Sequence, residues 1–256
     1  IRDSYNISPE NVILTFNNLT RTTNMVEIFN DMLSKLENSW GQPVDIEFTA
    51  TVDNSRKVRI NLLQCRPLRL PRTPDMPTAL PQNLSTEQIL LRTDRIISGG
   101  IVDSVRYVIY IDPAKYVRMQ SLNLKKSLGR VVGKLNEYFR VKKEKIMAVG
   151  PGRWGSTNID LGINVSYADI DNVTVLVEVG RTDTGNEPEL SYGTHFFQDL
   201  VESDIVYLPV IPDKLNTCFN SQFFASTPNM LTSILPDYTD FCLLYTSPSP
   251  RDRTRS

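Results

Sequence analysis

The stretch DIEFTATVDNSRKVRINLLQCRPL, residues 45–68, decides the fold of the N-terminal part of the chain because it has the pattern of a β-hairpin. Apolar and polar residues alternate along residues 43–52 and again along residues 57–65. This alternation is typical of strands that bury one face. The polar run Asp53–Arg56 separates the two and has the composition of a turn. The sequence therefore predicts an antiparallel hairpin.

The length of the turn sets which side chains of the hairpin share a face. A turn that closes on Val52 and Lys57 places Glu47 opposite Leu62, with Gln64 as its diagonal neighbour. Diagonal neighbours lie about 7–8 Å apart, within reach of long side chains. A carboxylate and an amide oxygen that converge there form a hard-oxygen site suited to Mg²⁺ with a nucleotide phosphate. We therefore expect a metal site at Glu47 and Gln64.

Arg66 follows this predicted site directly. Its guanidinium group has the shape and charge to hold the oxygens of a transferred phosphoryl group. The alternative interpretation is structural: Glu47 faces water, and Gln64 and Arg66 form hydrogen bonds with the segment that follows. The pattern of the hairpin leaves both interpretations open.

A resemblance to a known family bears on this choice. The stretches VDIEF, residues 44–48, and LLQCRP, residues 62–67, resemble the end of the ATP-grasp domain of pyruvate phosphate dikinase and phosphoenolpyruvate synthase. The resemblance implies that Glu47 and Gln64 bind Mg²⁺ and ATP phosphates. It also implies that Arg66 contacts the transferred phosphoryl group and so belongs to the catalytic residues. The expected partners are a nucleotide and a small-molecule phosphate acceptor.

The chain divides into segments of different character. Apolar residues at helical spacing between residues 25 and 36 predict a helix before the hairpin. We expect residues 1–70 to be the C-terminal end of an ATP-grasp nucleotide-binding domain. Five prolines lie between Pro67 and Pro81, which indicates an extended linker at residues 71–83. Residues 84–241 are expected to form an α/β domain of unknown role.

The last stretch, residues 242–256, differs from the rest. Its sequence CLLYTSPSPRD matches the translation of an adapter used in transposon-based sequencing libraries, and the chain begins at Ile1 without a methionine. We therefore interpret the chain as a fragment and leave residues 242–256 outside the fold and the function. The alternative interpretation is a natural disordered tail rich in serine, proline and arginine.

Predicted strands and helices alternate in the second domain. VRYVIYI (105–111) reads as a strand, residues 121–139 as an amphipathic helix, and NVTVLVEVG (172–180) as a strand. Such alternation indicates an α/β layer architecture, so the expected class of the whole chain is mixed α/β. Residues 84–241 also resemble a domain that follows ATP-grasp modules in large bacterial proteins similar to phosphoenolpyruvate synthase. The resemblance rests on ISGGIVDSVRYVIYIDP, GPGRWGSTNIDLGINVSYADI and PELSYGTHFFQDLVES.

The glycine-rich stretch GPGRWGS, residues 150–156, follows a predicted strand. Glycines let backbone amides approach an anion and Arg153 adds positive charge, so Gly152 and Arg153 are candidate nucleotide contacts. The alternative is a tight turn in which Trp154 fills the core. Glu178 lies within the apolar run VLVEV, where it is either a site residue or the partner of a buried cation.

His195 is the single histidine of the chain. Thr194 before it is a plausible helix N-cap, which places His195 in the first turn of a helix. The free amides and the helix dipole at this position favour an added phosphate. His195 is therefore a candidate phosphocarrier or proton donor, and the alternative is a packed structural residue. The TSHA stretch that carries the phosphohistidine of the dikinases does not occur in this sequence.

Composition sets limits on the function. Of the 256 residues 40% are hydrophobic and 22% are charged, with a net charge of −1. This balance argues against a general binder of nucleic acids or anionic membranes, and we expect neither as a partner. Membrane-span and signal-peptide patterns are missing, and three cysteines show no ligand or disulfide spacing. A reducing, cytoplasmic location is the simplest interpretation.

Together these observations predict a fragment of a cytoplasmic ATP-dependent phosphotransferase that is inactive as an isolated piece. The alternative is a non-catalytic nucleotide-binding or regulatory module with an ATP-grasp remnant.

Overall fold

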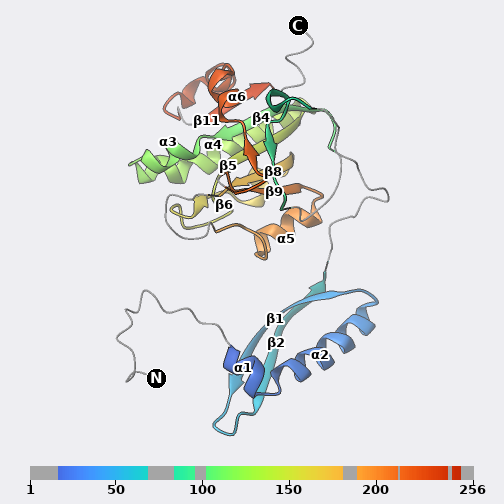
Figure 1. Cartoon of the computed structure of the whole chain (residues 1–256). Helices are drawn as coiled ribbons and strands as arrows, with labels where there is room; N and C mark the ends of the chain where they lie inside the picture. Colours follow the sequence, from blue (N-terminus) through green and yellow to red (C-terminus); the bar gives the residue numbers. More distant parts are fainter. Residues whose placement is uncertain are drawn as a thin grey trace. The chain divides into compact units, whose positions relative to one another are not determined.

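A computed structural model describes residues 17–68, 84–95, 102–180, 189–212, 214–241 and 244–248. The chain forms two compact units, Ile1–Arg69 and Leu70–Ser256 (Figure 1). Helices and sheets occur together, so the expected mixed α/β class is confirmed. The predicted linker at residues 71–83 lies outside the described residues.

The first unit consists of two helices and a hairpin. These elements are α1 (Asn17–Thr22), α2 (Met25–Trp40), β1 (Val44–Val52) and β2 (Val58–Pro67). The helix α2 ends at Gly41, whose φ of 70° closes the last turn with a hydrogen bond from its N–H to the carbonyl of Glu37. The ring of Phe29 in α2 meets the ring of Phe48 in β1 edge-on at 4.5 Å. The helix therefore contacts the face of the hairpin that carries Phe48.

The turn of the hairpin is one residue longer than expected. Val52 lies opposite Val58, so the strands do not close on Val52 and Lys57. The physical reason is the carboxylate of Asp53, which accepts hydrogen bonds from the N–H of Ser55 at 2.8 Å and of Lys57 at 2.9 Å. These two bonds hold Lys57 inside the turn, as expected for an Asx-type turn.

A β-bulge then changes the register again. Phe48 lies opposite Leu62, whereas Glu47 lies opposite Gln64, and the register shifts between Glu47 and Phe48. Leu63 is the extra residue of the bulge. The prediction that Glu47 opposes Leu62 with Gln64 on the diagonal is therefore wrong, because the long turn and the bulge together bring Glu47 and Gln64 directly opposite one another.

The second unit is built on a five-stranded sheet with the order β11-β4-β5-β8-β9. The strands β4, β5, β8 and β9 are parallel, and β11 is antiparallel to β4. The parallel strands lie side by side in chain order, so each connection from one strand to the next crosses over in the same direction. Because such connections are right-handed, the connecting helices lie on one face of the sheet. The bounds are β4 (Val105–Ile111), β5 (Lys145–Pro151), β8 (Val173–Val179), β9 (Val206–Val210) and β11 (Leu244–Pro248).

The helix predicted at residues 121–139 is confirmed as α4, which extends over Leu122–Val141 and is capped by Ser121. The helix α5 (His195–Glu202) precedes β9. The shorter elements are η2 (Thr86–Gln88), β3 (Leu91–Arg92), α3 (Pro113–Arg118), β6 (Arg153–Trp154), β7 (Gly162–Ile163), η3 (Tyr167–Asp169), β10 (Cys218–Phe219), α6 (Ser221–Ser226), α7 (Leu231–Ile234) and η4 (Pro236–Tyr238).

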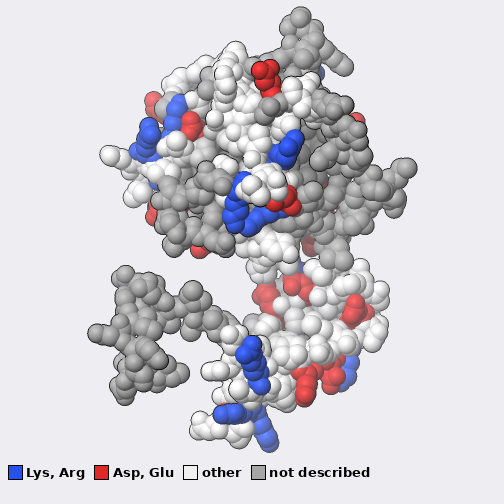
Figure 2. Space-filling model, viewed as in Figure 1, with Lys and Arg blue, Asp and Glu red and all other residues white. Residues whose placement is uncertain are grey.

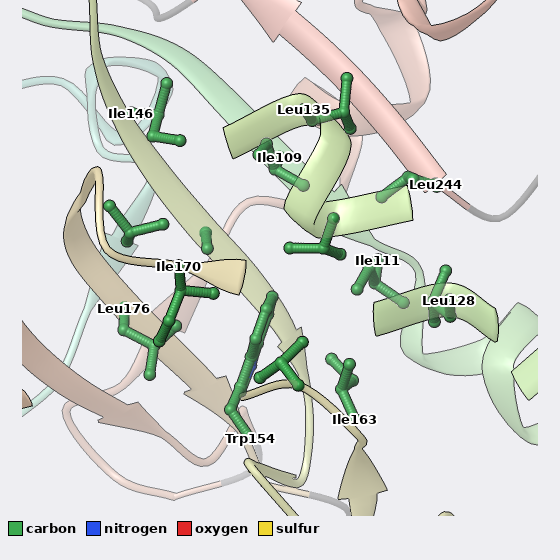
Figure 3. Close-up of a cluster of buried hydrophobic side chains, with 14 of the residues drawn as sticks. Ile109, Ile111, Leu128, Leu135, Ile146, Trp154, Ile163, Ile170, Leu176 and Leu244 are labelled. Atoms are coloured by element: carbon green, nitrogen blue, oxygen red, sulfur yellow. The ribbon is translucent and has the colours of Figure 1, made fainter. Parts of the chain in front are cut away.

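Two hydrophobic clusters cover the two faces of this sheet. Alternate residues of a strand point to opposite faces, so Ile109 and Leu176 join α4 and α5 in one cluster, whereas Val108 and Val177 join α6 in the other. The first cluster includes the fully buried Trp154, as Figure 3 shows. Further members of it are Ile111, Leu128, Leu135, Ile146, Ile163, Ile170 and Leu244.

The strand β11 lies within the tail that the sequence analysis left outside the fold. Leu244 is fully buried and lies opposite Ile111 in the adjacent strand. The side chain of Asn229 donates to the carbonyl of Leu244 at 2.9 Å and accepts from the N–H of Thr246 at 3.0 Å. The structure therefore places residues 244–248 in the sheet, where the sequence analysis left residues 242–256 outside the fold. The physical reason is that β4 offers them an unpaired edge and a core site for Leu244.

Candidate functional site

Four polar side chains gather on one face of the hairpin in the first unit. Glu47 lies opposite Gln64, and Asp45 lies opposite Arg66. Residues two apart on a strand share a face, and directly opposite residues of two paired strands do so as well. We call Asp45, Glu47, Gln64 and Arg66 the polar face of the hairpin. It is the face opposite to that of Phe48, which contacts α2.

The guanidinium group of Arg66 is held by a carboxylate. Its Nε atom lies 3.2 Å from Oδ2 of Asp45, and the side chains of both residues are about one quarter exposed, 26% and 28%. A partly exposed ion pair of this kind contributes at most about 1 kcal/mol to stability. Its chief consequence is positional, because it fixes a planar cation on the hairpin face that also carries Glu47 and Gln64.

The donor set fits one kind of metal site. In the described part of the chain, no group of three or more histidine, cysteine, aspartate or glutamate side chains is arranged to hold a metal ion. The polar face offers Glu47 and Gln64 as a pair of oxygen donors. Mg²⁺ is commonly held by one or two carboxylates together with substrate phosphates and water. The pair therefore fits a magnesium ion shared with a nucleotide and does not fit a metal cage made by protein alone.

The glycine-rich stretch at residues 150–156 does not offer its backbone amides to a ligand. Four consecutive N–H groups, those of residues 152–155, donate within the protein at 2.8–2.9 Å. The acceptors are, in order, the carbonyl of Val179, the carbonyl of Leu161, the carboxyl group of Glu178 and the carbonyl of Ile163. The expected backbone contact of Gly152 with an anion is therefore corrected, and the stretch is the tight turn of the alternative interpretation.

The side chains of this stretch support the same interpretation. Trp154 is 1% exposed and fills the core (Figure 3). Gly152 has a φ of +61°, and a Cβ atom there would lie 2.1 Å from the carbonyl oxygen of Leu161. Arg153 points its Nη1 atom at Oε2 of Glu189 over 3.3 Å. An anion that binds Arg153 has to compete with this carboxylate.

Glu178 accepts hydrogen bonds in the centre of the second unit. Its side chain is 0% exposed, and among the described residues no lysine or arginine forms an ion pair with it. The sequence left open whether Glu178 is a site residue or the partner of a buried cation. In the part of the chain that the structure describes, its partners are hydrogen-bonding groups and not a buried cation. The groups that contact its carboxyl oxygens are Trp154 N at 2.8 Å, Ser191 N at 2.7 Å, Ser191 Oγ at 2.5 Å and the Tyr207 hydroxyl at 2.6 Å.

The protonation state of Glu178 follows from burial and geometry. Burial raises the pKa of Glu178, and it outweighs the hydrogen bonds that lower it. Ser191 Oγ lies within reach of two acceptors, Glu178 Oε1 and the carbonyl of Trp154 at 3.1 Å, but it carries one proton. A protonated Glu178 satisfies both contacts, because it donates to Ser191 Oγ, which then donates to Trp154.

His195 is the first residue of α5, as predicted. The hydroxyl of Thr194 accepts from the N–H of Phe197 at 3.3 Å and donates to the carbonyl of Ser191 at 2.6 Å, so Thr194 is the N-cap. The side chain of His195 is exposed, whereas Phe197 is buried. The structure therefore does not bear out the alternative interpretation of His195 as a packed structural residue.

The predicted site residues are divided between the two units. Glu47, Gln64 and Arg66 come together on the hairpin. Arg153 and His195 belong to the second unit, where the turn at Gly155 meets the ring of Phe196 at the start of α5. Two residues of the buried cluster, Ser191 and Tyr207, were missed by the sequence analysis. A tyrosine within the apolar run IVYLPVI was the signal, because a buried carboxyl group requires hydrogen-bond donors.

The surface of both units mixes charges of opposite sign. Figure 2 shows lysine, arginine, aspartate and glutamate interspersed on the visible face, without an extended patch of one sign among the described residues. None of the helices in the described ranges is both long enough and apolar enough to cross a membrane.

Comparisons of the chain with protein-family models, with curated proteins and with solved structures gave no match.

Proposed function

We propose that the first unit is the end of a Mg²⁺·ATP-binding domain, and that the full protein is an ATP-dependent phosphotransferase that acts on a small molecule. The observation that carries the proposal is the register of the hairpin, in which a bulge places Glu47 directly opposite Gln64 and beside Arg66. The resemblance of residues 44–48 and 62–67 to the end of the ATP-grasp domain of phosphoenolpyruvate synthase and pyruvate phosphate dikinase supports the same function.

Each residue of the polar face has a role in this proposal. Glu47 and Gln64 would hold Mg²⁺ through their side-chain oxygens, and Mg²⁺ would neutralise charge on the ATP phosphates. Arg66 would contact the transferred phosphoryl group with its guanidinium donors. Asp45 orients Arg66 through the 3.2 Å contact at Nε.

The test compares two isosteric variants in the full-length protein. Glu47→Gln keeps the size of the side chain and removes the charge that would hold Mg²⁺. We expect ATP turnover to fall by about 100-fold or more. Glu37→Gln, on the exposed surface of α2 in the same unit, is the matched control and should leave turnover unchanged. Equal turnover of both variants at saturating Mg²⁺ would overturn the proposal.

The same experiment separates the catalytic proposal from a non-catalytic nucleotide-binding or regulatory module. In such a module, Mg²⁺-dependent ATP binding would weaken in Glu47→Gln, although the unmodified protein would not turn ATP over. The isolated chain is a further control. The polar face supplies few contacts, so we expect its own affinity for ATP to be no tighter than about 1 mM, near −4 kcal/mol, and Glu47→Gln to leave any tighter ATP binding by the isolated chain unchanged.

His195 enters the proposal as a candidate for phosphate transfer. It is exposed at the first position of a capped helix, where an added phosphate is favoured. Incubation of full-length protein with γ- and β-labelled ATP should give acid-labile, base-stable label if His195 is the carrier. Label that persists in His195→Asn excludes this role. ATP hydrolysis without any label leaves His195 as a proton donor or a surface residue.

A further inference from the structure

A pocket of about 850 Å³ opens in the second unit at the carboxyl edge of the parallel sheet. It lies where β4 and β8 end, and residues of α3, α6 and β11 complete its wall. In open α/β sheets ligands bind outside the carboxyl ends of the strands. Pockets of about 300–1,000 Å³ suit small molecules. The position and the size of this pocket therefore both indicate a ligand site.

The floor of the pocket is a cluster of aromatic rings. The rings of Tyr110 and Phe224 are stacked with centroids 3.8 Å apart, and the ring of Phe219 lies 5.6 Å from that of Phe224. The ring of Tyr245 lies 5.9 Å from that of Tyr110. All four residues line the pocket. Offset stacking on such a surface favours a planar ring in the ligand.

The rim of the pocket carries positive charge. Lys115 and Arg118 lie one turn apart on α3, and the side chains of both residues are exposed. The ammonium group of Lys115 contacts the hydroxyl of Tyr245 and lies 4.7 Å from the centre of its ring. The carboxylate of Asp112 also lines the pocket, but it accepts the N–H groups of Ala114 and Lys115 as the N-cap of α3. The rim therefore carries two cations and one carboxylate, and that carboxylate already accepts two backbone N–H groups.

We infer that this pocket binds a small organic anion of about the size of a mononucleotide, which combines a planar ring with a phosphate or carboxylate group. The ring lies against the partly exposed rings of Phe219 and Tyr245, which the buried stack of Tyr110 and Phe224 supports, and the anionic group meets Arg118 and Lys115. Guanidinium groups pair with both kinds of oxyanion through parallel hydrogen bonds. The proposal does not depend on the hairpin of the first unit, since every residue that lines the pocket belongs to the second.

Two matched pairs of probes test the inference on the 256-residue chain. AMP and adenosine differ by the phosphate, and indole-3-acetate and indole-3-acetamide differ by the carboxylate charge. Calorimetric titration should give a sub-millimolar dissociation constant for the anion of at least one pair. The anion should bind about tenfold more tightly than its neutral partner, which corresponds to about 1.4 kcal/mol. The pair that shows the difference identifies phosphate or carboxylate as the preferred group.

Variants assign the binding to the pocket. Arg118→Gln should weaken the anion about tenfold and remove its advantage over the neutral partner. Arg130→Gln, at an exposed position on α4 outside the pocket lining, should change nothing. Phe219→Leu keeps an apolar side chain but removes a ring, so it should weaken both members of the pair equally. Three results would each overturn the inference: no anion binding at ligand concentrations up to about 10 mM, equal affinity for both members of each pair, or an Arg118→Gln variant that binds the anion as tightly as the unmodified chain.

Discussion

The hydroxyl of Tyr207 donates a 2.6 Å hydrogen bond to the carboxyl group of Glu178 at a point where both side chains are at most 1% exposed. The same carboxyl group accepts the backbone N–H groups of Trp154 and Ser191. It therefore joins the glycine-rich turn after β5, the segment that precedes α5, and β9. These segments lie far apart in the sequence, so a single acid fixes one end of the second unit.

Replacement of Glu178 by glutamine should destabilise the second unit by about 1–3 kcal/mol. Each carboxyl oxygen faces one backbone N–H, Trp154 N at Oε1 and Ser191 N at Oε2. A protonated carboxyl oxygen both donates and accepts, whereas an amide nitrogen can only donate. One buried N–H group therefore loses its acceptor in either orientation of the amide. Denaturant unfolding measures the loss, and Glu202→Gln at the exposed end of α5 is the control. Equal midpoints for the two variants would contradict the assignment.

The stability of the second unit should decrease as the pH rises through the raised pKa of Glu178. Burial raises the pKa in the folded state, so the unfolded chain loses this proton first, near pH 4.3. The contribution of Glu178 is therefore complete below that value and is lost as the pH rises through the pKa of the folded state. The check is the difference in unfolding free energy between the unmodified chain and Glu178→Gln across the pH range. A difference that does not change with pH would mean that Glu178 keeps its ordinary pKa.

The sequence predicted those parts of the structure that depend on local pattern. Alternation located both strands of the hairpin, and the Thr194–His195 pair located the start of α5, because a strand face and a helix cap are set by neighbouring residues. The register of the hairpin was not predictable in this way. It depends on how Asp53 shapes the turn and on the bulge at Leu63. The pair Leu62–Leu63 interrupts the alternation at the bulge, but the turn leaves no such sign in the sequence.

The cluster around Glu178 shows what pattern alone cannot provide. Glu178 is recognisable as an acid in an apolar strand, but Ser191 lies 13 positions and Tyr207 29 positions away along the chain. The order of the strands brings them together, and no local period encodes that order. The role of the glycine-rich stretch could not be predicted for the same reason, because glycines are equally suited to an anion site and to a crowded turn. The choice depends on the distant carbonyl of Leu161 and the ring of Phe196.

Two glycines with similar backbone angles provide a test of that crowding. Gly155 and Gly193 have φ of +76° and +80°, so alanine is strained at both, by about 1–2 kcal/mol. A Cβ atom at Gly193 meets nothing within 4 Å, whereas one at Gly155 would lie 2.4 Å from Cδ2 of Phe196. Gly155→Ala should therefore lose about 1–3 kcal/mol more than Gly193→Ala, as expected for overpacking. The comparison of the two unfolding free energies isolates the contact, and equal losses would show that Phe196 moves aside freely.

The strand β11 provides the last prediction, since it lies in the tail that resembles a translated adapter. Leu244 is fully buried opposite Ile111, whereas Leu215 is 86% exposed. If β11 belongs to the folded sheet, Leu244→Ala should lower the unfolding free energy by about 2–5 kcal/mol through lost burial and a cavity. Leu215→Ala is the same chemical change on the surface and should cost less than about 0.5 kcal/mol. Hydrogen exchange at Thr246, whose N–H is bonded to Asn229, should be slowed by the same structure. Equal losses for the two leucines together with fast exchange at Thr246 would separate residues 244–248 from the fold and restore the boundary at residue 241.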